Sequence, residues 1–555
     1  MAFANVVIPA VFRRESRKTP YLRRTAWLIH MNKIASKSSC AEGHDSCHTR
    51  TGMVYAIFTL LIVMTAFIAC GSDRIQTPLE STSDDLLTSY DEMMNFVGIL
   101  QAETGRFSID TIAVTAEDRS VIMLHFDAPV EEERQPDEKL KVFLYAQQHG
   151  DEPSGKEAAL QLARDIASDD FGQILSSIDL YLVPQVNPDG SEKKQRNNAN
   201  DIDLNRDHLL LTQPEVSGLH RAFRRIMPEV TLDIHEYGIA GEAWTAAGMH
   251  KNFGSQMGAL SNPNMSINLR TFAWNSVFPF IEQHLRLSGI NFQRYLVAGD
   301  PSKRFRFSTT ALNDGRNSMG IYNTLSFILE GRKNETVEGN IHERTGRQLE
   351  TIKAFLTFFS DNAVEVKRLV ERERAEIVQG TLRPEAPIVM DYVKDPARPA
   401  VTVSVIDLAS NQLADKRFEN FYPLVRPSFS VLRPQGYAIP ADLTDVVDVL
   451  RRHNINVNET EMDIRAAVEI YRITGVQLTE REDKDALDVD VEVTRSVMPI
   501  QEGYYIVWCN QVQINLIVTL LEAQSQWGLA PLPEFSSLLN VGANYPIIRI
   551  MRLLE

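Results

Sequence analysis

Cysteine is scarce in this chain, with only four among 555 residues. Cys40, Cys47 and Cys70 lie before or at the end of the main apolar run, so only Cys509 belongs to the body of the sequence. Disulfide bonds therefore cannot organise the fold, and the lack of a CxxC pair gives no sign of a structural zinc site.

Basic charge is also in short supply over most of the chain. Residues 1–52 carry nine Lys or Arg against three Asp or Glu, a balance of +6, and since the whole chain carries −16, the remainder carries −22. So acidic a body argues against a nucleic-acid partner, which would need a basic surface. The content of hydrophobic residues, 44%, is ordinary for folded protein, and the length predicts more than one domain.

Apolar patterns predict alternating strands and helices over the middle of the chain. Segments 108–115 and 120–126 predict a hairpin with Glu117-Asp118 in its turn. Further patterns predict helices at 86–102, 157–167 and 352–359, and strands at 142–146, 178–183 and 230–234. This alternation predicts an α/β fold, in which a twisted, mixed but largely parallel sheet has helices on both faces.

Four prolines, at positions 384, 387, 396 and 399, indicate a domain boundary. We therefore expect one domain over residues 86–378 and a smaller α+β domain over 379–555. Patterns in the second domain predict strands at 401–406 and 504–508, helices at 442–452 and 514–523, and a solvated acidic loop at 480–492. No catalytic constellation is found there, so the role of this domain stays open.

The N-terminal region contains an uncharged apolar run, Met53–Ala69, that follows the basic residues 1–52. The run leads into Phe67-Ile68-Ala69-Cys70-Gly71-Ser72, which resembles the lipobox of bacterial lipoproteins, although Phe67 departs from the usual aliphatic residue. The resemblance implies a lipid anchor on Cys70 and an exported protein facing the periplasm of a bacterial envelope. Residues 1–52 would be a leader or a start-site extension, 53–70 the signal and 71–85 a tether. An uncleaved membrane anchor and a different cleavage remain open.

The segment His149-Gly150-Asp151-Glu152 lies between a predicted strand and a predicted helix. Open α/β sheets place their sites at this end of a strand. A catalytic zinc ion uses three protein ligands and leaves a fourth position for water, and two His with one Glu is a known set. The motif is short, however, and a solvated loop with an exposed His would produce the same pattern.

Five further features follow in order: Asn187-Pro188-Asp189-Gly190, Arg196, Asp203-Leu204-Asn205-Arg206, and two strands that end in His235 and Glu330. Together with the HxxE motif they resemble the M14 family of zinc metallocarboxypeptidases over about residues 85–375. The family's motifs occur here in the family's order.

The resemblance implies a role for each of these residues. His149, Glu152 and His235 would hold one Zn²⁺, and Glu330 would act as general base and then acid. Arg196 would stabilise the oxyanion of the tetrahedral intermediate. Each role has a plainer alternative, namely a solvated surface for Arg196 and an ion pair with Arg332 for Glu330.

Asn205 and Arg206 would bind the substrate's terminal carboxylate, and Asp203 would orient His149. An ion pair with a neighbouring aspartate is the alternative for Arg206. Asp233 and Glu236 flank His235, and for them an orienting role and a solvated one are both open. The family's lid tyrosine lies roughly twenty residues before the base, whereas Tyr322 lies eight before it, so Tyr322 is either a substrate-binding residue or a strand-edge aromatic.

The resemblance therefore predicts a zinc carboxypeptidase that cleaves peptides with a free C-terminal carboxylate, including cell-wall stem peptides. A murein-peptide amidase of the same fold and a small-molecule deacylase of the desuccinylase and aspartoacylase type remain alternatives. A non-catalytic binding lipoprotein is the alternative from another class.

Overall fold

The computed structural model describes residues 74–126, 139–333, 336–380, 387–395, 400–481 and 484–554. Residues Ile75–Glu555 form one compact unit. The apolar run and Cys70 lie outside the described residues. Within the described ranges, no helix has the length and apolar character needed to cross a membrane.

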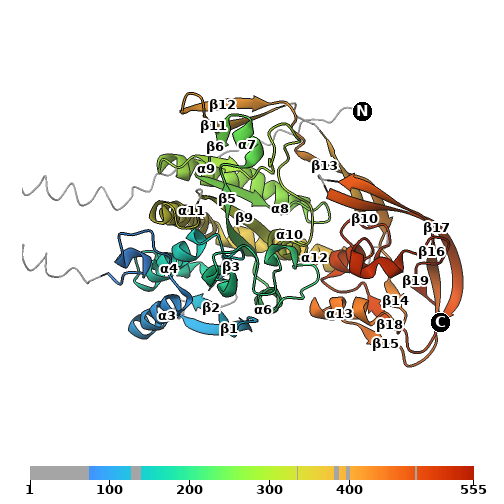
Figure 1. The fold of residues 1–555 in the computed structure, drawn as a ribbon. Helices are drawn as coiled ribbons and strands as arrows, with labels where there is room; N and C mark the ends of the chain where they lie inside the picture. Colours follow the sequence, from blue (N-terminus) through green and yellow to red (C-terminus); the bar gives the residue numbers. More distant parts are fainter. Residues whose placement is uncertain are drawn as a thin grey trace, which may run out of the picture. The chain divides into compact units, whose positions relative to one another are not determined.

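An eight-stranded sheet with the order β1-β2-β4-β3-β5-β9-β7-β8 forms the centre of this unit (Figure 1). The neighbours β4, β3, β5 and β9 are parallel, whereas β1, β2 and β7 pair with antiparallel partners. The predicted mixed, largely parallel sheet is therefore confirmed. The strands are β1 (Ser108–Val114), β2 (Ser120–Phe126), β3 (Leu140–Ala146), β4 (Ile178–Val183), β5 (Val230–Gly238), β7 (Ser255–Ala259), β8 (Phe292–Arg294) and β9 (Leu325–Lys333).

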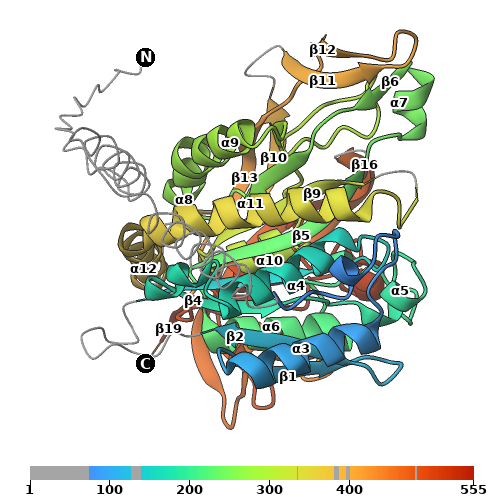
Figure 2. The same cartoon turned by 90° about the vertical axis from the view of Figure 1, so that its left-hand side faces the viewer.

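Helices cover both faces of this sheet (Figures 1 and 2). Helices α4 and α11 pack against each other on one face, and α6 and α10 lie on the other. Because both faces of the central strands are covered, β3 and β5 are buried along almost their whole length. The main helices are α3 (Tyr90–Thr104), α4 (Ser154–Ala167), α6 (Pro214–Ile226), α8 (Ile267–Phe272), α9 (Phe278–Leu287), α10 (Gly315–Gly320), α11 (Ile341–Asp361) and α12 (Ala363–Gly380).

The C-terminal region is rich in strands and adds three smaller sheets, with the orders β10-β13, β12-β11-β6 and β15-β18-β14-β19-β16-β17. The two strands and two helices predicted here are confirmed, as β11, β18, α13 and α14. The elements are β10 (Pro387–Asp395), β11 (Val401–Asp407), β12 (Gln412–Phe418), β13 (Leu424–Leu432), β14 (Gly436–Ile439), α13 (Thr444–Arg452), β15 (Asn458–Glu459), β16 (Ile464–Arg481), β17 (Lys484–Ile500), β18 (Tyr505–Trp508), α14 (Ile514–Leu521) and β19 (Ile548–Leu553).

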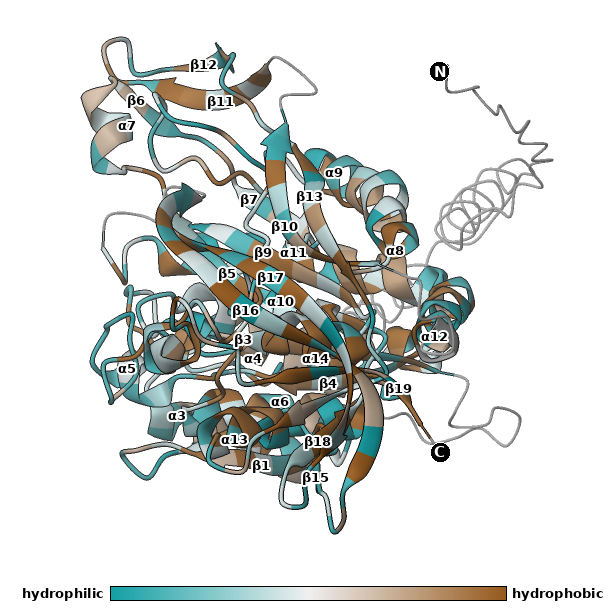
Figure 3. Ribbon diagram, turned by 90° about the vertical axis from the view of Figure 1, so that its right-hand side faces the viewer, coloured by the Kyte–Doolittle hydropathy of each residue, from teal (hydrophilic) through white to brown (hydrophobic). Residues whose placement is uncertain are grey.

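The prediction of a solvated loop at 480–492 is wrong, because most of this stretch belongs to the long hairpin of β16 and β17. Asp488, Asp490 and Glu492 alternate with Val489 and Val491, so the acidic side chains lie on one face of β17 and the valines on the other. Figure 3 shows the alternation as bands of different hydropathy along the two strands. A period of two is typical of a strand, but the acidic composition led to the prediction of a loop.

One short strand links the two halves of the chain. β6 (Met249–Lys251), which follows β5, pairs antiparallel with β11, so that Lys251 lies opposite Val405. Around this pairing a separate apolar cluster buries Trp244 and Phe305 against Val403 and Val405. The C-terminal region therefore packs on segments that leave the carboxyl end of the central sheet. The domain boundary expected near residue 379 stays a prediction.

Candidate active site

Sheet register brings together the ends of three neighbouring strands. Ile234 of β5 lies opposite Ala146 of β3, and His235 lies opposite Glu330 of β9. Paired residues on parallel neighbours project to the same face, so the imidazole of His235 and the carboxylate of Glu330 are neighbours. His149 comes three residues after the end of β3, at the same edge of the sheet.

The loop that carries His149 and Glu152 is held by the Asn187-Pro188-Asp189-Gly190 turn. A Cβ atom at Gly150 would lie 2.1 Å from the carbonyl carbon of Gly190, so no side chain fits at this position. Asn187 Nδ2 donates to the carbonyl of Gln148 at 3.1 Å, and the Gly150 amide donates to the carbonyl of Arg196 at 3.3 Å. The turn therefore fixes the HxxE loop and the arginine loop against each other.

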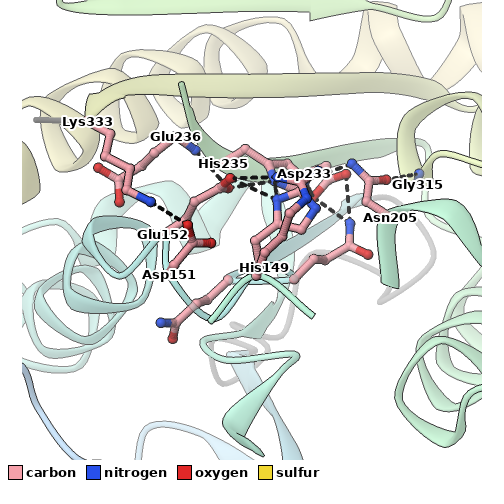
Figure 4. A network of polar contacts seen from close by, with 12 residues as sticks. His149, Asp151, Glu152, Asn205, Asp233, His235, Glu236, Gly315 and Lys333 are labelled. Atoms are coloured by element: carbon pink, nitrogen blue, oxygen red, sulfur yellow. Dashed lines mark hydrogen bonds and ion pairs between the residues drawn. The ribbon is translucent and has the colours of Figure 1, made fainter. Parts of the chain in front are cut away.

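His149, Glu152 and His235 converge at this edge, and one ligand atom of each lies within 4.8 Å of the others (Figure 4). The two Nδ1 atoms are 3.1 Å apart, and they lie 2.9 and 3.0 Å from the two oxygens of Glu152. All three side chains are buried. Two imidazole lone pairs this close to each other and to a carboxylate fit a shared cation, and imidazole nitrogen with carboxylate oxygen suits zinc.

A second carboxylate holds the far side of each imidazole. Asp203 Oδ1 lies 3.0 Å from Nε2 of His149, and Asp233 Oδ1 lies 2.8 Å from Nε2 of His235. These contacts turn both Nδ1 atoms towards Glu152 and select the matching tautomer. Burial would raise the pKa of Asp203, but His149 and Arg196 hold it well below the usual range for a carboxyl group.

Neither of the residues that flank His235 is solvated. Asp233 is fully buried, and both of its oxygens also accept from Gln148 Nε2 at 2.9 Å. Glu236 forms a buried bidentate pair with Arg344, with distances of 2.9 and 2.8 Å. Asp233 therefore has the position of an orienting carboxylate, whereas Glu236 ties α11 to the end of β5.

The Asp203→Asn substitution should weaken zinc binding by about 10–100-fold, because the amide cannot raise the basicity of the His149 imidazole as a carboxylate does. Competition with a chromophoric chelator measures this constant directly. Asp201→Asn, an exposed change two residues away, serves as the matched control and should leave the affinity unchanged. An unaltered constant for Asp203→Asn would show that this carboxylate does not support the metal site.

Glu330 has the setting expected of a proton-transfer group. Its side chain is 9% exposed, and its Oε2 has no hydrogen-bond partner among the described residues. Burial raises the pKa of Glu330 to about 7, and Glu152 and Asp233 add to this rise while the two imidazoles oppose it. The guanidinium of Arg332 donates to Asn252 Oδ1 at 3.0 Å, so the structure gives it a partner other than Glu330.

The three polar residues expected to contact substrate flank this centre. Arg196 donates to Asp203 Oδ2 from Nε and Nη2 at 3.1 and 3.0 Å, and its Nη1 lies 3.5 Å from Glu152 Oε1. Asn205 Nδ2 lies 3.3 Å from His235 Nε2. Arg206 is exposed and donates to the Asn205 carbonyl at 2.6 Å. Arg196 is thus tied to the site and is not an isolated surface cation.

Tyr322 does not lie with these residues. It is 1% exposed in the hydrophobic core, where its ring packs edge-on against Phe223 of α6 at 5.4 Å. A side chain enclosed in this way cannot bind substrate, so its position corrects the substrate-binding prediction.

Tyr295 is the tyrosine that the structure brings close to Glu330. It follows β8, and its ring faces the guanidinium of Arg316 at 6.0 Å. Burial, and then the Glu330 carboxylate, raise the pKa of Tyr295 well above its usual range. It lies 35 residues before Glu330, and only its place directly after a short edge strand could have indicated it from the sequence.

Comparison with known proteins agrees with this geometry. Residues 93–222 match the family model Peptidase_M14, described as zinc carboxypeptidase. The chain is 26% identical to Carboxypeptidase 2 of Trichophyton rubrum over 439 residues, covering 74% of this chain and 77% of that protein. It is 36% identical to Carboxypeptidase SOL1 of Arabidopsis thaliana over 125 residues, covering 20% of this chain and 24% of that one. Among solved structures, a metallo-carboxypeptidase from Burkholderia cenocepacia gives a TM-score of 0.39 at 20% identity and covers 49% of this chain and 69% of its own.

The comparisons also correct the predicted location. Carboxypeptidases that match about three quarters of this chain come from fungi of the genus Trichophyton, among them T. rubrum and T. tonsurans, at 74% and 75% of its length. The prediction of a bacterial cell-envelope lipoprotein is therefore wrong. Neither the lipid anchor nor cell-wall stem peptides as substrates find support in these relatives.

Proposed function

The chain belongs to the M14 family of zinc carboxypeptidases and is a metallocarboxypeptidase, and from this premise we propose that it removes C-terminal residues from peptides with one zinc ion at His149, Glu152 and His235. One observation carries the proposal. Three ligand atoms within 4.8 Å of one another lie beside the Glu330 carboxylate, which the sheet register places next to His235. When bound, zinc lowers the pKa of a water molecule and polarises the scissile carbonyl.

Glu330 moves the proton in this proposal. Its unpartnered Oε2 accepts a proton from the attacking water and returns it to the leaving nitrogen. A carboxyl group whose pKa lies near neutrality can do both, because neither its ionised nor its protonated form is strongly disfavoured. Burial supplies this property, since the charged form loses its contact with water.

Arg196 supplies positive charge where the oxyanion develops. Its two bonds to Asp203 fix the guanidinium plane, and its Nη1 remains directed towards the ligand Glu152. A cation held in place before the reaction stabilises the developing charge without rearranging during it. Asp203 therefore serves two residues, because it orients both His149 and Arg196.

Asn205 and Arg206 are the residues that we assign to the substrate's terminal carboxylate. The Arg206 guanidinium is exposed beside the site, and its contact with the Asn205 carbonyl uses only one of its five N–H groups. The remaining donors can form the paired bonds that a carboxylate accepts.

The Arg206→Ala variant should lose about 10–100-fold in kcat/KM on peptides with a free C-terminus, as expected when hydrogen bonds to a charged group are removed. Peptides with an amidated C-terminus should be equally poor substrates for both proteins, since they lack the charge that Arg206 binds. Arg225→Ala, an exposed arginine on α6, is the matched control. An equal loss on free and amidated peptides would argue against an exopeptidase.

A further inference from the structure

A second cavity lies next to the catalytic centre, between α8 and the strands of the C-terminal region. It has a volume of about 830 Å³ and is lined by residues of β7 and α8, by the segment after β8, and by β10, β11 and β13. A volume of this size accommodates a ligand of several residues. The catalytic residues assigned above are not part of its lining.

The lining of this cavity combines positive charge with aromatic rings. Arg270, Arg294 and Lys394 contribute to it, and no Asp or Glu occurs among its described lining residues. The guanidinium of Arg294 lies 4.8 Å from the ring centroid of Trp274. Cations with one sign of charge between apolar walls attract anions more strongly than the same cations on an open surface.

Arg270 is the cation of this set that has an unsatisfied buried donor among the described residues. Its Nε is buried and has no hydrogen-bond partner among the described residues. Burial lowers the pKa of Arg270, so holding its charge in the folded protein has a cost. A carboxylate in the cavity would offset that cost and satisfy the orphaned N–H group.

Tyr295 connects the cavity to the catalytic centre. Its amide donates to the Met257 carbonyl at 2.9 Å, and its Cβ would lie 3.0 Å from a Cβ placed on Gly258. A Cβ at Gly258 would also lie 3.1 Å from Cγ2 of Ile328, so the missing side chain leaves room for both neighbours. Gly258 lines the cavity, and Gln256, two residues earlier on β7, lies opposite Glu330, so one strand joins the cavity wall to the proposed base.

Ser308 also lines the cavity. Its Oγ accepts from Arg316, its carbonyl accepts from Lys394 Nζ at 3.2 Å, and its φ of 120° is unusual for a non-glycine residue. Arg316 forms a salt bridge with Asp314 at 3.0 Å, so its charge is balanced within the protein. Arg270, whose Nε has no hydrogen-bond partner among the described residues, is thus better placed than Arg316 to attract a substrate carboxylate.

We propose that this cavity binds the side-chain carboxylate of an acidic residue near the C-terminal end of the peptide substrate, with Arg270 as the specificity residue. The proposal rests on the carboxypeptidase function above and adds a substrate class to it. The pairing of β7 with β9, which carries both the cavity wall and Glu330, favours a side chain of the bound peptide over a separate small anion.

Matched peptides test the proposal. Three pairs carry Glu or Gln at the last, the second-last or the third-last position and are otherwise identical. We expect kcat/KM to be at least about 10-fold higher for the Glu member of one pair, through a lower KM. Arg270→Gln should bring that ratio close to one and leave the Gln peptides unaffected, whereas Arg270→Lys should retain part of it. Equal rates within all three pairs, or a ratio that survives Arg270→Gln, would overturn the proposal.

Calorimetric titration separates this proposal from the catalytic one. The full-length Glu330→Gln protein is titrated with the same peptides, so that binding is measured without turnover. The cavity proposal is supported if the Glu330→Gln protein binds the Glu peptide more tightly than the Gln peptide and the double variant with Arg270→Gln does not. This result would hold whether or not the native protein cleaves peptides. If the native protein cleaves the Glu and Gln peptides of each pair equally well and the Glu330→Gln protein binds them equally, the catalytic proposal is supported and the cavity proposal is rejected.

Discussion

The Glu330→Gln variant should keep its zinc and lose turnover by about 10²–10⁴-fold, the usual contribution of a positioned acid–base group. Glutamine has the same shape as glutamate but cannot accept a proton from water, whereas the three ligands are untouched. Steady-state rates on a peptide with a free C-terminus, together with elemental analysis of the same preparation, measure both parts of the prediction.

The pH profile gives this test a second readout. Glu330 acts as a base only when ionised, so kcat/KM of the native protein should rise with pH through the pKa of Glu330. That pKa is about 7 without a cation, and a bound cation lowers it, so the acidic limb should fall at or below pH 7. The limb should vanish from the residual rate of Glu330→Gln. Glu343→Gln, on the exposed side of α11, is the control. Full activity in the Glu330 variant would assign the base to another residue.

Zinc content should fall from about one ion per chain to almost none in His235→Gln, and activity should fall to background. Two remaining ligands bind zinc far more weakly than three, and the buried Nδ1 of His235 is shared between His149 and Glu152 in the present geometry. The chelator-treated native protein should recover activity when zinc is added back, whereas the variant should not.

An exposed histidine provides the control for this loss. His284→Gln on α9 removes a partly exposed imidazole far along the chain from the site and should retain the metal. Circular dichroism of both variants distinguishes loss of zinc from loss of fold. If His235→Gln keeps a full equivalent of zinc in a folded chain, the assigned ligand set is wrong.

Sequence patterns alone were enough to predict which residues gather at the catalytic edge of the sheet. His149 and Glu152 lie three residues apart on one loop, and His235 and Glu330 each follow the apolar part of a strand, so both signals are local. Parallel packing then brings these positions to the same edge of the sheet. Glu152 and His235, 83 positions apart, and His235 and Glu330, 95 positions apart, therefore lie together. Asp203 was also predictable, because it belongs to the same short motif as Asn205 and Arg206.

Other features depend on packing that no local pattern encodes. Tyr295 is brought to Glu330 by the pairing of β7 with β9 and by the missing side chain at Gly258, whereas Tyr322, closer in sequence, is drawn into the core by Phe223. The cations Arg270 and Lys394 are 124 residues apart and share a cavity only because α8 and β10 both border it. Their common cavity could not have been predicted from either segment alone.

The pairing of β6 with β11 has a practical consequence for anyone who wishes to shorten this chain. A version that stops near residue 380 would leave β6 with a bare edge and would uncover the rings of Trp244 and Phe305, which now pack on Val403 and Val405. Open strand edges next to apolar patches promote aggregation. A soluble truncated protein therefore needs residues 400–421 as well, even if all of its catalytic side chains precede them.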